Sequence, residues 1–280
     1  MQTAAERIAA FILERERIRI KKESGGKRPW TTDPILAKYR FCNVRREDDK
    51  VTRWLKKHWR DPFAGHPNMT AALLLARMVN WPPTLEWMGF PEKWDPERMV
   101  DCIHDMHGKG KAWSSAYIVS TCGEKIDKAV YVVRTASQVQ ARPWYSPNVG
   151  DTLDSVWTRL RTINGLGAGF IAAQVVADLK HCDESLMKAE DWWTWAVPGP
   201  GSKRGLNRYY GLLTEASWTT AGWQTALRPM IDAVSPLIGG MELHAQDWQN
   251  CLCEFDKYER VRNGEGKPRA GYTPSSAYQV

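Results

Sequence analysis

Three alternate glycines constrain the fold of this chain more than any other feature of its sequence. Gly165, Gly167 and Gly169 lie within residues 153–179, and apolar residues recur at helical spacing on both sides of them. Glycine accepts a positive φ and has no Cβ, so alternate glycines allow a tight turn and let another group approach the bare backbone. We therefore predict two helices joined by a hairpin over residues 153–179.

The predicted hairpin is typical of a phosphate-binding site. The second helix begins directly after the glycines, so its unpaired N–H groups and the positive end of its dipole face any anion at the turn. Glycine pairs also open dinucleotide-binding folds, but those need a β-strand before the glycines, where this sequence has a helical period. A plain helix–helix turn with a C-cap glycine remains the alternative. On the first interpretation, Gly165, Gly167 and Gly169 contact DNA phosphates.

The order of motifs after the hairpin resembles that of the helix-hairpin-helix DNA glycosylases. Asp191 follows the hairpin, and a basic segment with Lys203 and Arg204 follows Asp191. In that superfamily an aspartate at the mouth of the base pocket comes a helix after the hairpin and precedes a basic helix. The resemblance implies an all-α fold of this type, in one lobe or two. The link to Asp191 is longer than in that pattern, and a Pro-Gly-Pro-Gly loop at 198–201 is additional.

A second resemblance covers more of the chain. Its segments are Glu-Arg-Glu-Arg-Ile at 14–18, Arg-Pro-Trp-Thr-Thr-Asp-Pro-Ile-Leu at 28–36, Tyr-Arg-Phe-Cys-Asn-Val-Arg-Arg-Glu-Asp-Asp at 39–49 and Leu-Cys-Glu-Phe-Asp-Lys-Tyr at 252–258. Together with the hairpin and the Pro-Gly-Pro-Gly-Ser loop, they resemble the phage thymine-hypermodification family. That family includes the α-glutamyl/putrescinyl-thymine pyrophosphorylases, also described as amino acid:DNA transferases, and the helical domain that accompanies 5-hydroxymethyluracil DNA kinases.

The second resemblance implies chemistry at a modified thymine. An amine or amino acid displaces pyrophosphate from 5-(pyrophosphoryloxymethyl)uracil in double-stranded DNA. The base must leave the stack, cations must neutralise the departing pyrophosphate, and a carboxylate must orient or deprotonate the attacking amine. We assign the amine to Asp191, the pyrophosphate to Arg40, Arg46, Lys203 and Arg204, and the base pocket to Asn43 and Trp30, with Lys203, Arg204 and Trp30 also in contact with the DNA.

The residues expected to contact the pyrophosphate depend partly on a predicted helix. Asp33 followed by Pro34 is typical of an N-cap and the first helical position. If the helix continues, Arg40, Asn43 and Arg46 share one polar face. A ladder of salt bridges within that helix, without function, is the alternative for this face.

The rest of the sequence is predicted to be helical as well. Helices are expected at 4–22, at 49–58 and at 69–79, and the last of these is almost wholly apolar, which predicts that it is buried. The only strand-like run, 129–133, suits a helix equally. We expect one helical DNA-modification domain over residues 1–263, followed by an extended basic tail over 264–280.

Composition agrees with a nucleic-acid partner. The net charge of +7 favours a polyanion, and 15 tryptophans supply flat faces for unstacked bases as well as core bulk. No metal site is expected, because the six cysteines lack a suitable ligand spacing. The Gly-Lys-Gly-Lys run at 108–111 lacks P-loop spacing, so we expect no ATP binding of that type and no cofactor. No membrane segment or signal peptide is predicted, which favours the cytoplasm, that of the host if the chain is phage-encoded.

Three functions are compatible with these observations. The first is the amine:DNA transferase described above. The second is a non-catalytic DNA-binding partner of a 5-hydroxymethyluracil DNA kinase. The third is a base-excising glycosylase in which Asp191 stabilises an oxocarbenium-like sugar.

Overall fold

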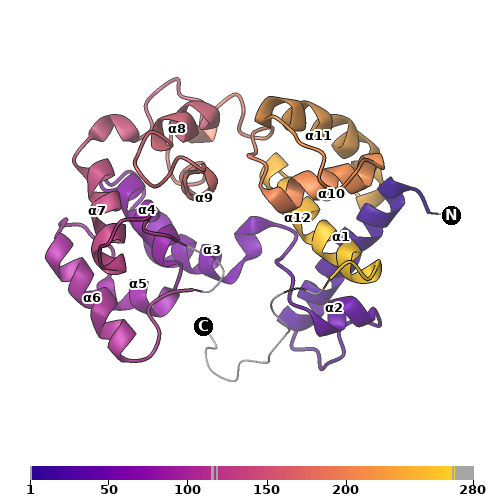
Figure 1. The fold of residues 1–280 in the computed structure, drawn as a ribbon, viewed down its shortest axis with the longest axis horizontal. Helices are drawn as coiled ribbons and strands as arrows, with labels where there is room; N and C mark the ends of the chain where they lie inside the picture. The colour runs from indigo at the N-terminus through magenta and orange to yellow at the C-terminus, as the bar shows by residue number, and fades with distance from the viewer. Residues whose placement is uncertain (1, 115–116, 118, 267, 269–280) are drawn as a thin grey trace. The chain divides into compact units, whose positions relative to one another are not determined.

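The structure is a computed structural model that describes residues 2–114, 117, 119–266 and 268. These residues form α-helices joined by turns, short 3-10 segments and one π-helical turn, and none of them forms a β-strand. The predicted all-α class is therefore confirmed. The chain divides into two compact units (Figure 1): a terminal unit of Met1–Asp49 and Ala196–Val280, and a central unit of Lys50–Trp195.

The central unit is built around α4. Every residue of this helix, Met69–Val79, is buried, and α7 and α9 pack against it. The prediction of a buried apolar helix at 69–79 is thus confirmed to the residue. The α-helices that the structure describes in this unit are α3 (Lys50–Leu55), α4 (Met69–Val79), α5 (Pro82–Met88), α6 (Pro96–Gly108), α7 (Lys128–Gln140), α8 (Leu153–Leu160) and α9 (Phe170–Leu179), with the π-helical turn η2 (Lys56–Arg60) directly after α3.

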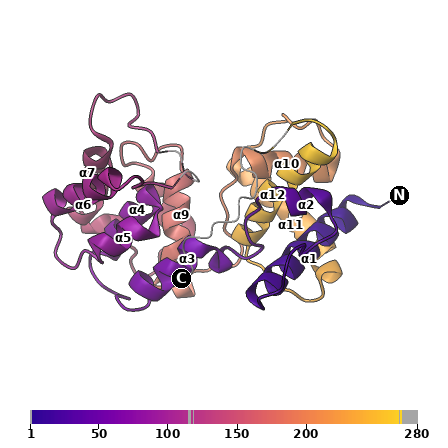
Figure 2. The same ribbon diagram turned by 90° about the horizontal axis from the view of Figure 1, so that it is seen from below.

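The terminal unit combines segments from both ends of the chain. The indigo α1 and the yellow α12 lie side by side in Figures 1 and 2, and α1 begins in a capping box in which Thr3 and Glu6 accept each other's backbone N–H groups. Among the described residues, the α-helices of this unit are α1 (Ala4–Glu23), α2 (Pro34–Lys38), α10 (Pro200–Tyr210), α11 (Thr220–Val234) and α12 (Ala245–Arg262).

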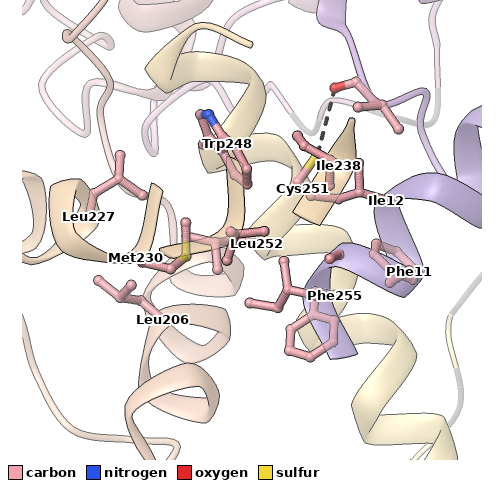
Figure 3. Close-up of a cluster of buried hydrophobic side chains, with 14 of the residues drawn as sticks. Phe11, Ile12, Leu206, Leu227, Met230, Ile238, Trp248, Cys251, Leu252 and Phe255 are labelled. Carbon is pink, nitrogen blue, oxygen red and sulfur yellow. Dashed lines mark hydrogen bonds between the residues drawn. The ribbon is translucent and has the colours of Figure 1, made fainter. Parts of the chain in front are cut away.

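An apolar core holds the terminal unit together. Figure 3 shows Phe11 and Ile12 of α1 near Leu252 and Phe255 of α12, with side chains of α10 and α11 completing the cluster. Phe11, Ile12, Leu252 and Phe255 are each at most 5% exposed. Helices α1 and α12 lie far apart along the sequence, so burial of their apolar faces against each other and their neighbours stabilises them.

Two motifs of the second resemblance meet where α10 packs against α12. Gly201 and Gly205 lie one turn apart on α10, which begins in the Pro-Gly-Pro-Gly-Ser segment. A Cβ on Gly201 would come within 2.5 Å of Cys253 Sγ, and a Cβ on Gly205 would overlap the Leu252 carbonyl oxygen. The glycines let two helix backbones approach closely, so packing accounts for both motifs.

The predicted helical face after Pro34 is wrong. Helix α2 ends at Lys38, because Tyr39 has extended backbone angles, with φ of −107° and ψ of 152°. Arg40, Asn43 and Arg46 therefore share no helix, and the alternative of a salt-bridge ladder within such a helix is wrong as well.

Three smaller expectations concern 129–133, the tail and the membrane. Residues 129–133 lie within α7 and are helical. Most of the predicted basic tail, from 269 to 280, lies outside the described residues. Among the helices that the structure describes, none combines the length and the apolar character needed to cross a bilayer.

Candidate nucleic-acid interface

The predicted hairpin is present between α8 and α9 of the central unit. Gly165 and Gly169 have φ values of 92° and 80°. A Cβ on Gly165 would overlap the Tyr131 hydroxyl, and a Cβ on Gly169 would lie 2.9 Å from the Trp157 ring, whose Nε1–H donates to the Gly169 carbonyl at 3.0 Å. The two outer glycines are therefore required by the turn itself and by its packing.

Gly167 is the glycine that faces open space. A Cβ there would meet no atom within 4 Å, and its φ is outside the left-handed region. Within the described part of the chain, no acceptor receives the backbone N–H of Gly167 or Ala168. Arg161 donates its Nε–H to the Gly167 carbonyl at 3.1 Å, and its guanidinium lies 4.4 Å from the Trp157 ring. Open N–H groups beside a cation and a helix N-terminus form an arrangement that suits a phosphate.

The segment before α8 is fixed by an ion pair. Arg159 donates to both carboxylate oxygens of Asp151, at 2.6 and 2.5 Å. Hydrogen bonds from Arg159 hold the pKa of Asp151 at about 2, with a smaller contribution from Ser155. The pair therefore stays ionised at neutral pH and keeps the entrance to α8 in place.

Asp191 caps α8. Its Oδ1 accepts the Leu153 N–H at 2.8 Å and its Oδ2 accepts the Asp154 N–H at 3.0 Å. Those residues open the helix, and the first N–H groups of a helix have no acceptor within it. The structure thus gives this carboxylate a supporting role at the helix that leads into the hairpin. Its action as a general base stays a prediction.

We expect Asp191→Ala to lower the free energy of unfolding by about 1 kcal/mol, the usual cost of removing a side-chain helix cap. The exposed neighbouring carboxylate Glu190 provides a control of the same charge, and Glu190→Ala should leave stability within about 0.5 kcal/mol of the wild type. Urea denaturation followed by circular dichroism measures both. Equal stability of the two variants would show that the cap contributes nothing.

Side chains of α1 and α12 hold the loop that replaces the predicted helix. Arg15 of α1 donates to the carbonyls of Phe41, at 2.9 Å, and Cys42. Glu254 of α12 accepts the Cys42 N–H at 3.0 Å. Backbone groups that a helix would satisfy internally are satisfied here by buried side chains, which is the physical reason why α2 stops.

The three residues for which a shared helical face was predicted lie along this loop instead. Arg40 is exposed. Asn43 donates its side-chain amide to the Asp48 carbonyl at 2.7 Å, and Arg46 donates its backbone N–H to Asp247 at 2.8 Å. These contacts shape the loop, and the assignment of the three residues to catalysis stays a prediction.

The basic residues of α10 are paired within the terminal unit. Lys203 Nζ donates to the Trp218 carbonyl at 2.9 Å. Arg204 Nε donates to Asp256 at 2.9 Å, and Arg208 donates to the other oxygen of that carboxylate at 2.8 Å. Asp256 is almost fully buried, so Arg204 helps to compensate a buried charge.

Trp30 is also held by its own surroundings. Its Nε1–H donates to the Gly26 carbonyl at 2.6 Å, and the Arg28 guanidinium lies 4.6 Å from the ring.

The site residues predicted from the sequence lie in both units. Those in the central unit are Gly165, Gly167, Gly169 and Asp191, and those in the terminal unit are Trp30, Arg40, Asn43, Arg46, Lys203 and Arg204.

Comparison with known proteins identifies the family. The family described as "5-hmdU DNA kinase, helical domain" matches residues 2–268. The chain belongs to this family. This confirms the resemblance to the phage thymine-hypermodification family that the motifs predicted.

A curated relative supports the same relation. The 5-hmdU DNA kinase of Bacillus phage SP10 is 24% identical over an alignment of 279 residues, which covers 88% of this chain and 43% of that kinase. This helical-domain chain therefore spans less than half the length of the relative. No solved structure matches this chain, and its likeness to DNA glycosylases stays a prediction.

Sequence reasoning missed a buried ionic cluster in this helical domain. Asp178 of α9 accepts hydrogen bonds from Arg77 of α4, at 2.5 and 2.6 Å, and from Arg60 at 3.3 Å. All three side chains are at most 2% exposed. The apolar helices α4 and α9 each contain one charged residue, Arg77 and Asp178. Charged residues are rarely buried without a partner, so this pattern could have predicted the ion pair.

Proposed function

We propose that this chain is a DNA-binding helical component of a phage thymine-hypermodification system. Its hairpin holds the backbone of double-stranded DNA that contains 5-hydroxymethyluracil, and a 5-hydroxymethyluracil DNA kinase acts on the bound site. The curated relative is a 5-hmdU DNA kinase of which the match covers 43%. The Gly-Lys-Gly-Lys run of this chain lacks P-loop spacing. We therefore assign DNA binding to this helical domain and phosphoryl transfer to the kinase that acts on the bound site.

The open face of the hairpin carries this proposal. Gly167 has room for an approaching group, and the N–H groups of Gly167 and Ala168 point to no acceptor among the described residues. Arg161 adds a positive charge at the same turn. The net charge of +7 supports a polyanionic partner.

We expect Gly167→Asp to weaken duplex DNA binding at least tenfold while leaving the fold intact. The new carboxylate enters open space, so no atom has to move. It stands where a phosphate binds, and two like charges about 4 Å apart near a protein surface repel by about 4 kcal/mol. Fluorescence anisotropy with a labelled duplex that contains 5-hydroxymethyluracil measures the dissociation constant.

Gly167→Ala is the matched control. It adds a methyl group without charge at the same place, so it should weaken DNA binding less than Gly167→Asp, and the difference between the two variants measures the effect of the charge. Arg161→Ala should lower the slope of log K against log salt by about 0.9, the value for one phosphate contact. Wild-type affinity in Gly167→Asp, with native circular dichroism, would remove the hairpin from the DNA site.

Amine transfer is the second candidate, favoured by the position of the Asp191 carboxylate in the same unit as the hairpin. We suggest incubating the protein with DNA that contains 5-(pyrophosphoryloxymethyl)uracil, together with glutamate or putrescine, and analysing the nucleosides by mass spectrometry. A new nucleoside with the mass of the amine adduct establishes transfer. Abasic sites and a released base establish a glycosylase. Unchanged DNA that nevertheless binds the protein supports the DNA-binding role.

A further inference from the structure

Lysine side chains lie over tryptophan rings at a second place in the central unit. The Gly-Lys-Gly-Lys segment begins with the last residue of α6, and its lysines lie beside Trp87 of α5 and Trp81, the N-cap residue of α5. The distances from Nζ to the ring centroid are 4.1 Å for Lys109 and Trp87, 3.9 Å for Lys111 and Trp81, and 4.4 Å for Lys128 and Trp113. We call Trp81, Trp87, Lys109 and Lys111 the Lys–Trp strip.

The backbone beside the strip is anchored. Thr84 of α5 donates its hydroxyl to the Ala112 carbonyl at 2.9 Å, and the Ser114 N–H donates to the Val79 carbonyl at 3.2 Å. Thr84 is fully buried and Ala112 is 1% exposed. The lysines are therefore presented from a segment tied to α4 and α5, whereas their own side chains are exposed.

We propose that the Lys–Trp strip binds a single DNA strand, with a base stacked on Trp87 and phosphates beside Lys109 and Lys111. This inference rests on the DNA binding proposed above but uses elements other than the hairpin. Trp87 is 53% exposed, and an aromatic face accepts any unpaired base. A base that stacks there takes the place of the lysine, whose ammonium then lies within reach of the phosphate of the same strand.

The charge of the strip suits a short stretch of strand. Trp81 is the N-cap residue of α5, and Trp87 lies within the helix. Residues 109–114 carry two lysines and no acidic residue, and α5 adds the single carboxylate Glu86. Bases of an intact duplex are stacked inside it, so the ring face selects an unpaired base.

The test uses a fluorescently labelled single strand of twelve thymidines and, separately, a duplex of the same length that contains 5-hydroxymethyluracil. Lys109→Ala combined with Lys111→Ala should lower the salt slope for the single strand by about 1.4, because each phosphate contact on a single strand contributes about 0.7. Trp87→Ala should weaken single-strand binding about tenfold, and Trp87→Phe should keep most of the affinity, because its ring still stacks.

Matched controls come from the same unit. Lys57→Ala combined with Lys188→Ala removes two exposed charges outside the strip and should leave the single-strand slope unchanged. Trp193→Ala removes another half-exposed tryptophan and should leave the affinity unchanged. Thermal unfolding checks that every variant is folded.

The outcomes separate this proposal from the proposed function. If the strip variants bind the single strand like the wild type while Gly167→Asp still weakens duplex binding, the strip assignment is overturned and the hairpin function stands. If the wild type binds neither probe, the proposed function itself is overturned. If the strip variants lose binding to a polyglutamate peptide and keep their oligonucleotide affinity, the strip is a protein-binding surface and the nucleic-acid assignment is overturned.

Discussion

Asp178→Ala is expected to lower the free energy of unfolding of the central unit by about 3–5 kcal/mol, the cost of breaking a buried ion pair. The Asp178 carboxylate is fully buried and receives hydrogen bonds from Arg77 and Arg60, which are buried as well. Truncation removes the anion that compensates these guanidinium groups, and an uncompensated charge in the protein interior is costly. Urea denaturation followed by circular dichroism measures the change.

An exposed ion pair in the same unit provides the comparison. Lys56 and Asp61 lie 2.6 Å apart, and each side chain is 52% exposed. Because solvent screens this pair, Asp61→Ala should cost no more than about 0.5 kcal/mol. If Asp178→Ala also cost less than about 1 kcal/mol, the buried cluster would not hold α9 against α4 in the way that its geometry indicates.

Gly205→Ala is expected to destabilise the terminal unit by about 3 kcal/mol, the upper range for overpacking a close contact. The new Cβ would overlap the Leu252 carbonyl oxygen. That oxygen belongs to the backbone of α12, so the helices must separate to admit the methyl group. Gly201→Ala should cost less, because the atom in its way is the Cys253 sulfur, which can move with its side chain.

Gly108→Ala is the matched control for this prediction. Gly108 is the last residue of α6, and a Cβ there would meet nothing within 4 Å. Alanine is the better helix former, so stability should be unchanged or higher by up to about 1 kcal/mol. Thermal unfolding by calorimetry compares the three variants. A loss in Gly205→Ala no larger than in Gly108→Ala would contradict the close approach of α10 and α12.

The parts of the fold that depend on local sequence were predictable. Helical periodicity predicted 4–22 and 69–79, and the observed α1 and α4 differ from these by at most one residue at an end. The loop after α2 depends instead on Arg15 and Glu254, the second of which lies more than 200 residues away along the chain. Local propensity contains no information about such partners, so the sequence favoured a helix there.

The hairpin shows the same division within a single motif. Its three glycines are equivalent in the sequence pattern, but Tyr131 and Trp157 occupy the space beside Gly165 and Gly169 and leave Gly167 open. The capping contact of Asp191 with α8 was equally beyond a spacing argument, since it joins residues 37 and 38 positions apart. Sequence motifs located the segment, and only tertiary contacts separated its structural residues from its candidate binding residue.

The terminal unit contains segments from both ends of the chain, and this limits the order in which the two units can fold during synthesis. The helix against which Phe11 of α1 packs, α12, is made more than 200 residues after α1. At 5–20 residues per second, the delay is roughly 10–40 s. The central unit, whose residues are contiguous, can be complete within that interval. Helix α1 is thus synthesised well before α12, the helix that helps to bury its apolar face, and its apolar side chains stay exposed during that interval.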